Sequence, residues 1–217
     1  MRIGVLGTGA AGRAIGSRLV ELGHEVRLGA RSAGNPGSLD WLRHAGGSAS
    51  AGTFADAASF GERIFNCTAG MHSLDALGAA GAENLADKLL VDVSNPLDYS
   101  GGALPSLAVS NTDSLGEQIQ RAFPDARVVK SLNTMNNAVM VNPALVPGEH
   151  VVFVCGNDAT AKQEAAELLG QFGWPDERIL DLGDISAARG TEMYLALWLR
   201  LGGAIDATQF NIAIARR

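Results

Sequence analysis

A glycine-rich turn, GTGAAG, occupies residues 7–12 and fits the spacing G-x-G-x-x-G. It follows a short aliphatic run, Arg2–Leu6, and precedes a helical pattern over residues 11–22. In such a strand–turn–helix unit Gly7 permits the tight turn, Gly9 lets a ligand approach the backbone, and Gly12 lets the helix pack close to the strand. The helix start offers free N–H groups and a positive dipole end. The turn is therefore predicted to bind the pyrophosphate of a dinucleotide, the alternative being a glycine turn without a ligand.

A cation stands where many nucleotide-binding chains carry an acid. About 20 residues after the turn, the segment Leu28-Gly29-Ala30 leads to Arg31 and Ser32 without any Asp or Glu. An acid at this place binds a ribose 2′-hydroxyl, whereas an Arg accommodates a 2′-phosphate with its planar fork of donors. The pair predicts NADP(H) over NAD(H), the alternative being a solvated surface arginine.

Composition excludes several classes of partner. The chain has 217 residues, 47% of them hydrophobic and 18% charged, with a formal net charge of −6. No basic run is present, which argues against a nucleic-acid partner because phosphate binding needs a clustered positive face. The apolar runs are shorter than the roughly 18 residues of a membrane span, and the aliphatic start is too short for a signal peptide. We expect no membrane partner and a cytoplasmic protein whose two cysteines, Cys67 and Cys155, are reduced and buried.

The alternation of short apolar runs with helical patterns predicts an α/β fold, a doubly wound and mostly parallel sheet of the Rossmann type. We expect a single NADP-binding domain over residues 1–217, with a short C-terminal helical part, about 184–217, packed on it. That part is apolar over a wide arc, so it is either buried in its own subunit or forms the contact of a homodimer. Strands are predicted over residues 2–6, 25–28, 63–67, 89–93, 127–130, 151–155 and 179–182, and helices over 11–22, 38–45, 54–60, 73–80, 114–123, 158–172 and 185–201. Ser38 is read as the cap of the second helix, Ser114 with Glu117 as a capping box, and Asn157 or Asp158 as a later cap.

No set of side chains in the sequence forms a catalytic triad, a carboxylate dyad or a metal cluster, so we predict no metal and name no catalytic residue. The four histidines are scattered without ligand spacing. Only His72 falls near the expected ligand, as a polar contact or proton donor, or as a solvated loop residue. Asn133, Asn136 and Asn137 are either ligand-binding amides or loop caps, and Lys130 is read as a strand residue.

Several longer segments resemble a known family. They are LGARS (residues 28–32), VDVSNPL (91–97), VVKSLNTM (128–135), VFVCGND (152–158) and ILDLGDISAARGTEMYLALW (179–198). Together with GTGAAG they resemble the F420-dependent NADP oxidoreductases over nearly the whole chain. The same fold unit forms the cytoplasmic domain of the Steap metalloreductases.

The resemblance implies a set of cofactor contacts at the ends of successive strands. Arg31 and Ser32 would take the 2′-phosphate, and Thr68 and Ala69 would flank the middle of the cofactor. The chain departs from the family at Gly70, where proline is frequent, and at residues 35–37, which carry no cation. The pyrophosphate contacts would be Thr8, Gly9, Ala10 and Ala11, and the nicotinamide side would be lined by Asn95, Pro96, Asn133, Thr134 and Met135.

The activity implied by the resemblance is hydride transfer between NADPH and a flat redox acceptor, either the deazaflavin coenzyme F420 or a flavin. The rings carry the chemistry, and the protein supplies proximity and orientation. Cations expected at the rim for an anionic acceptor are few, Arg189 and Arg200. Two alternatives stay open: an imine or carbonyl reductase on a similar scaffold, and a non-catalytic NADPH-binding module that senses redox state through a protein partner.

Overall fold

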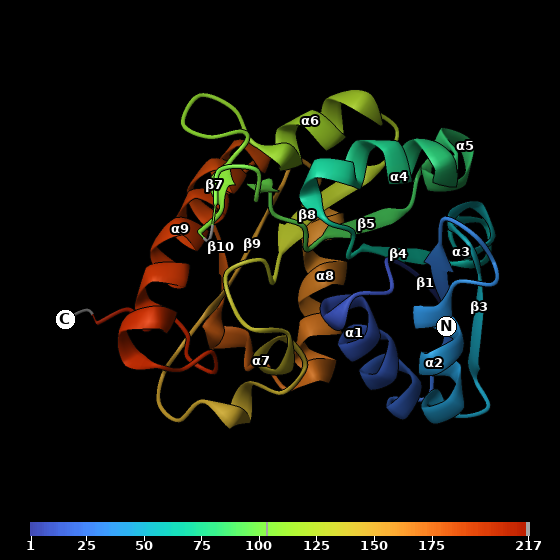
Figure 1. Cartoon of the computed structure of the whole chain (residues 1–217), viewed down its shortest axis with the longest axis horizontal. Coiled ribbons are helices and arrows are strands. Elements are labelled where there is room, and N and C mark those ends of the chain that lie inside the picture. The colour runs from blue at the N-terminus through green and yellow to red at the C-terminus, as the bar shows by residue number, and fades with distance from the viewer. Residues whose placement is uncertain (103, 216–217) are drawn as a thin grey trace.

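The computed structural model describes residues 1–102 and 104–215, and its centre is a single eight-stranded sheet (Figure 1). The strand order is β10-β9-β8-β5-β4-β1-β2-β3, and every pair is parallel except β8 with β9. The predicted doubly wound, mostly parallel sheet is confirmed. Its strands are β1 (Arg2–Leu6), β2 (Glu25–Ala30), β3 (Ala49–Thr53), β4 (Arg63–Asn66), β5 (Leu89–Asp92), β8 (Arg127–Ser131), β9 (Val152–Gly156) and β10 (Ile179–Asp181).

Helices cover both faces of the sheet, as the connections between parallel strands require. One face packs on α1 (Ala10–Glu21), α2 (Pro36–Ala45), α7 (Asn137–Val141) and α8 (Ala159–Phe172). The other packs on α3 (Phe54–Phe60), α4 (Ser73–Ala80), α5 (Ala82–Leu85), α6 (Leu115–Ala122) and the start of α9 (Ala188–Ile205). Short 3-10 helices occupy Gly70–His72, Pro143–Leu145, Asp176–Arg178 and Ile185–Ala187.

The apolar periodicity of the sequence reappears as two separate cores. Ile15 and Leu19 of α1 are fully buried and join the core that contains Ile3 and Val5 of β1. The neighbouring Leu6 points to the opposite core, because successive side chains of a strand face opposite sides of the sheet. Strands buried on both faces therefore read as continuous apolar runs, which made β1, β4 and β5 predictable.

The order of the strands creates a crevice at the carboxyl ends of two central strands, β1 and β4. After β1 the chain builds β2 and β3 on one side and then crosses over to β4 on the other side. The carboxyl ends of β1 and β4 thus lead into loops that turn in opposite directions. Ligands of open α/β sheets bind at such a switch point.

Several sequence-based boundaries are corrected by the structure. Asn35, rather than Ser38, caps α2, since its side-chain oxygen accepts hydrogen bonds from the N–H groups of Gly37 and Ser38. Asp158 caps α8, whereas the side chain of Asn157 accepts from Ile185 N–H. The last helix begins three residues later than predicted and runs to Ile205. The sequence reading also missed β3, α7 and the two-stranded ladder of β6 (Leu97–Asp98) with β7 (Ser106–Leu107).

Figure 1 shows α9 in red along the side of the molecule away from β1–β3. Among the described residues, no helix is both long enough and apolar enough to cross a membrane. The division of the chain into one domain with an appended helical part stays a prediction.

Candidate cofactor site

Two of the three glycines in the turn are explained by the packing of the chain itself. Gly7 has a φ of +113°, a conformation that favours glycine, and an added Cβ would lie 2.6 Å from the carbonyl oxygen of Cys67. A Cβ at Gly12 would overlap the carbonyl oxygen of Gly7. Both residues therefore let α1 start directly against the end of β1.

Gly9 is different, because neither conformation nor packing requires a glycine there. Its φ of −73° is open to any residue, and a built Cβ has no atom within 4 Å. It stands at the N-cap of α1, where no described side chain caps the helix and no acid occupies the first turn. Open space above an uncapped helix start is the arrangement that a pyrophosphate needs, since the backbone N–H groups face it directly. The residues present thus fit the phosphates of a dinucleotide.

A cavity of about 490 Å³ extends from this turn to the end of β2. Arg31 lines it and is exposed, and within the described part of the chain its guanidinium has no hydrogen bond or ion pair. The start of α2 lies close to the glycine turn, because a Cβ at Gly37 would lie 3.2 Å from the Thr8 hydroxyl oxygen. The lining residues are Gly7, Thr8, Gly9, Arg31, Phe54, Cys67, Thr68, Ala69, His72, Asp75, Ala76 and Ala79.

A second cavity, of about 270 Å³, adjoins the first over the end of β4, and Cys67, Thr68 and Ala69 line both. No charged side chain lines it among the described residues. Burial raises the pKa of the Cys67 thiol well above its ordinary value, and the Asp92 carboxylate adds to this. The thiol is therefore neutral. The two adjoining cavities together form a trough, and the end of this trough away from Arg31 is a neutral pocket. Its lining residues are Ala11, Cys67, Thr68, Ala69, Gly70, Val93, Ser94, Asn95, Leu97, Tyr99 and Met140.

Most of the predicted contacts meet at this trough, and the others lie around it. Gly7, Thr8, Gly9, Ala11, Arg31, Thr68, Ala69 and Asn95 line one or both cavities. Ala10 and Ser32 are exposed beside it, Gly12 is buried under the turn, and Pro96 lines a neighbouring 220 Å³ cavity.

Asn133, Thr134 and Met135 are buried and lie outside the lining of the trough. The Nδ2 of Asn133 donates to Asn95 Oδ1 at 3.0 Å, and Asn95 Nδ2 donates to the Asn133 carbonyl at 2.8 Å. Asn133 thus holds the amide of Asn95, which reaches the cavity. Direct cofactor contacts by these three residues stay a prediction.

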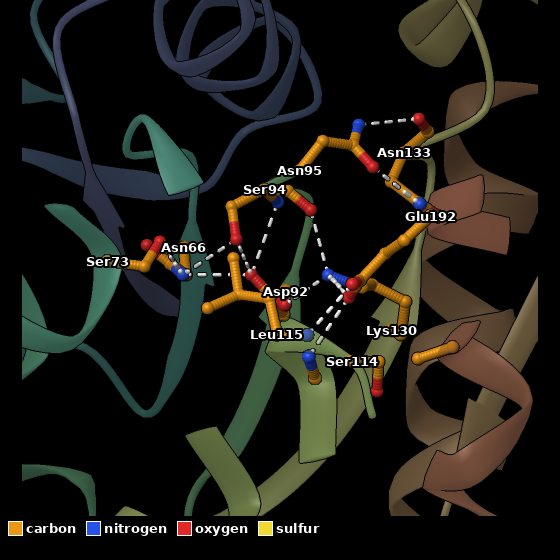
Figure 2. Close-up of polar contacts among 12 residues, drawn as sticks. Asn66, Ser73, Asp92, Ser94, Asn95, Ser114, Leu115, Lys130, Asn133 and Glu192 are labelled. Atoms are coloured by element: carbon orange, nitrogen blue, oxygen red, sulfur yellow. Dashed lines mark hydrogen bonds and ion pairs between the residues drawn. The ribbon is translucent and has the colours of Figure 1, made fainter. Parts of the chain in front are cut away.

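A buried polar network beneath the trough was missed by sequence reasoning (Figure 2). Lys130, read as an ordinary strand residue, is almost fully buried, and its ammonium lies 2.6 Å from Asp92 Oδ2 and 2.8 Å from Glu192 Oε1. It also donates to the Ser94 carbonyl at 2.8 Å. The sequence did contain a signal for this network, namely one charged residue in each of two apolar strands and in one apolar helix. Charged residues are almost never fully buried unless they are paired, so these three could have been expected to pair with one another.

The same network reaches the cavity wall at Thr68. Asn66 Nδ2 donates to Asp92 Oδ1 at 2.8 Å, and Asn66 Oδ1 accepts from the Thr68 hydroxyl at 2.7 Å. Thr68 and Ser94 both line the neutral cavity. Their backbone turns are therefore held from below by fully buried side chains.

The remaining candidates have structural or surface roles. Arg189 forms two hydrogen bonds with the carboxylate of Glu117, at 2.8 and 2.6 Å, and this pairing lowers the pKa of Glu117. Arg200 is exposed on α9. His72 lines the larger cavity, whereas Asn136 caps α7 through its side-chain oxygen. Among the described residues, no group of three or more His, Cys, Asp or Glu is placed to hold a metal.

Comparisons with known proteins assign the chain to a family. A crystal structure of a protein from Arthrobacter sp. FB24, provisionally described as an F420-dependent NADP-reductase, is 51% identical over 99% of both chains, with a TM-score of 0.93. The chain belongs to the family of coenzyme F420-dependent NADP oxidoreductases. The family model, "NADP oxidoreductase coenzyme F420-dependent", matches residues 2–96. Within this family the prediction of an NADP-dependent oxidoreductase is confirmed as a class.

More distant relatives are longer proteins, and the chain matches only part of each. Metalloreductase STEAP3 of Rattus norvegicus is 32% identical over 204 residues, and metalloreductase STEAP2 of Homo sapiens is 26% identical over 196. The chain spans 37% and 35% of their lengths. An imine reductase of Streptomyces aurantiacus, 19% identical with a TM-score of 0.68, shares the fold over 94% of this chain and 63% of its own.

The two glycines at the start of α1 allow a matched test of this site. Gly12→Ala is expected to lower the free energy of unfolding by about 1–3 kcal/mol, because the added methyl overpacks the turn. Gly9→Ala is expected to leave stability within about 0.5 kcal/mol, because nothing opposes its Cβ, yet to weaken NADPH binding at least about tenfold. Urea unfolding and NADPH titration measure the two effects. Unchanged NADPH affinity in Gly9→Ala would contradict the site.

Proposed function

We propose that the protein transfers a hydride between NADPH and a flat redox acceptor, with coenzyme F420 as the first candidate and a flavin as the second. The observation that carries this proposal is the order of chemistry along the trough. A free cation lies at one end, an uncapped helix start in the middle, and a neutral pocket at the other end. A 2′-phosphorylated dinucleotide has the matching order: phosphate, pyrophosphate and nicotinamide.

Arg31 supplies the recognition of the 2′-phosphate in this proposal. Since its guanidinium has no partner among the described residues, binding a phosphate costs no existing ion pair. A bidentate contact between guanidinium and phosphate is among the stronger hydrogen-bonded pairs in proteins. Ser32 is exposed beside it and adds a hydroxyl donor. Among the described residues, no other Arg and no Lys side chain lines the larger cavity, so preference for NADP(H) rests on Arg31 in this proposal.

At the neutral end, the protein's own contribution is positioning and the exclusion of water. When bound, NADPH supplies the hydride. The amide of Asn95 is fixed by its reciprocal bonds with Asn133 and offers its remaining hydrogen-bonding capacity to the cavity. Leu97, Tyr99 and Met140 give apolar surface to the same wall. Because no charged side chain among the described residues lines this cavity, proximity and orientation are the proposed means of catalysis.

The exposed side of α9 supports a further part of the proposal, a homodimer. Met193, Leu197, Leu201 and Ile205 recur every four residues and are 39%, 54%, 37% and 54% exposed. This row extends over about 18 Å of helix. A two-fold contact must be self-complementary, and an evenly spaced row satisfies this when two copies run antiparallel. Met193 then lies opposite Ile205, and Leu197 opposite Leu201, so we propose a second copy as the occupant.

A non-catalytic, redox-sensing NADPH-binding module is the second candidate function. The same exposed row of α9 favours it, if a different protein covers these side chains. The two functions differ in one property, the turnover of an acceptor. Cytoplasmic location stays a prediction in either case.

Replacing Arg31 tests the cofactor preference. Arg31→Ala is expected to raise the dissociation constant for NADPH about tenfold to a hundredfold, because a charge-assisted bidentate contact is lost. The constant for NADH should change little, since NADH has no 2′-phosphate. Arg200→Ala, on exposed α9, is the matched control. Equal effects of Arg31→Ala on both nucleotides would remove the assignment.

The acceptor is tested by following NADPH oxidation by absorbance with coenzyme F420, and then with a flavin. Turnover with NADPH well above that with NADH is the expected result. NADPH binding without turnover on either acceptor would instead favour the redox-sensing module.

Sedimentation tests the proposed contact on α9. The wild-type chain is expected to sediment as a dimer, and Leu197→Glu as a monomer, because the change places a charge at the centre of the apolar row. NADPH titration of the variant checks that the fold is intact. A monomeric wild type at micromolar concentration would remove the dimer.

A further inference from the structure

Three charged side chains from three elements meet beneath the neutral cavity (Figure 2). Asp92 ends β5, Lys130 lies in β8, and Glu192 lies in α9. All three are at most 1% exposed. The ammonium bridges the two carboxylates at 2.6 and 2.8 Å. The proposed function uses none of these three charged groups directly.

The hydrogen bonds supply both carboxylates with donors only. The oxygens of Asp92 accept from Asn66 Nδ2, from the N–H and O–H of Ser94, and from the ammonium. Those of Glu192 accept from the backbone N–H groups of Leu115 and Gly116, at 2.8 and 3.0 Å, and lie against the same ammonium. Every contact is a donor, which is the environment that suits a charged carboxylate.

The cluster therefore carries a net formal charge of one negative unit, two carboxylates against one ammonium. Burial opposes the charged form of Lys130, but Asp92 and Glu192 outweigh it and raise the pKa of this lysine, so it remains protonated. The N–H groups at the start of α6 offset part of the excess, because Glu192 binds the positive end of that helix. The remaining negative potential acts through a poorly screened interior.

This charge lies one hydrogen bond behind the cavity wall. Ser94 lines the neutral cavity, its hydroxyl donates to Asp92 at 2.6 Å, and its carbonyl accepts from Lys130 at 2.8 Å. Within the part of the chain that the structure describes, the cavity lining itself contains no charged side chain. A ring bound in the cavity thus experiences the cluster without a compensating charge in the wall.

We infer that the Asp92–Lys130–Glu192 cluster favours the cationic, oxidised nicotinamide over the neutral, reduced ring, and so biases the bound cofactor toward NADP⁺. The inference rests on the proposed function, which places the nicotinamide in this cavity. Its consequence is a direction: the protein is suited to taking a hydride from NADPH. Asp92, Lys130 and Glu192 are positioning residues in this account, because they act through Ser94 and through space.

The test is the ratio of the dissociation constants of NADP⁺ and NADPH, measured by titration of each nucleotide. Glu192→Gln removes one negative charge and is expected to raise the ratio Kd(NADP⁺)/Kd(NADPH) about three- to tenfold. Asp92→Asn removes the other negative charge and is expected to raise the ratio by a similar factor. A general loosening of the site weakens both nucleotides together and leaves the ratio unchanged. A raised ratio in both variants is thus specific to electrostatics.

Glu164→Gln is the matched control. Glu164 pairs with Arg63 and Arg127 at 2.6 and 2.8 Å. Both arginines are the first residues of their strands, β4 and β8. This cluster therefore lies at the amino ends of the strands, whereas the cavity lies at their carboxyl ends. The substitution is chemically identical and removes the same charge. The ratio is expected to stay within about twofold of wild type.

The outcomes distinguish failure of the proposed function from failure of the inference about the buried cluster. If the wild type binds neither nucleotide, the proposed function fails and the inference fails with it. If both bind and the ratio is unmoved in the variants, the inference alone is overturned. Should Glu192→Gln fail to fold, as judged by circular dichroism, Asp92→Asn carries the same expected shift.

Discussion

The two ion pairs of the Lys130 ammonium, with Asp92 and with Glu192, are the interactions on which the rest of the site depends. The ammonium joins β8 to the end of β5 through Asp92 and to α9 through Glu192, and Glu192 in turn holds the start of α6. Removing one partner from a buried ion pair costs about 3–5 kcal/mol, because an uncompensated charge is left behind. The cluster therefore specifies where the strand ends and the final helix lie relative to one another.

The trough above this cluster shows a division between rigid and open parts. Ser94 and Thr68 are held from below by fully buried groups, Asp92 and Asn66. Gly9 and Arg31, by contrast, are exposed and have no side-chain contact that fixes them within the described residues. The framework is thus satisfied internally, and the unsatisfied donors are those that face the ligand, which is the arrangement expected of a preorganised binding site.

The neutral pocket and the buried charge beneath it separate two tasks. In the proposed function a flat ring would lie against a neutral wall without the loss of any ion pair, and in our inference the field of the cluster would act on that ring from behind. The scarcity of cations near the cavity bears on the acceptor, because Arg189 is engaged with Glu117. An anionic tail on the acceptor would therefore extend into solvent, or meet Arg200 only if it reaches the exposed side of α9.

Local rules of the sequence determined much of this protein. GTGAAG after an aliphatic strand predicted the turn and the start of α1, and Arg31 without an acid indicated a 2′-phosphate, because both signals depend on neighbours in the chain. The buried strands were found by their apolar runs. β3 was missed, since ASAGT has a single β-branched residue, Thr53, and no aromatic one, and its pairing with β2 makes it a strand.

Only the tertiary structure decided the partners of the buried charges and the openness of the trough. Asp92, Lys130 and Glu192 are 38 and 62 residues apart along the chain, and no local pattern encodes that they meet. The same holds for Asn133, whose amide holds Asn95 from behind, and for the antiparallel pairing of β9 with β8. Periodicity reports which face of an element is buried, whereas the partner on that face is chosen by the packing of distant elements.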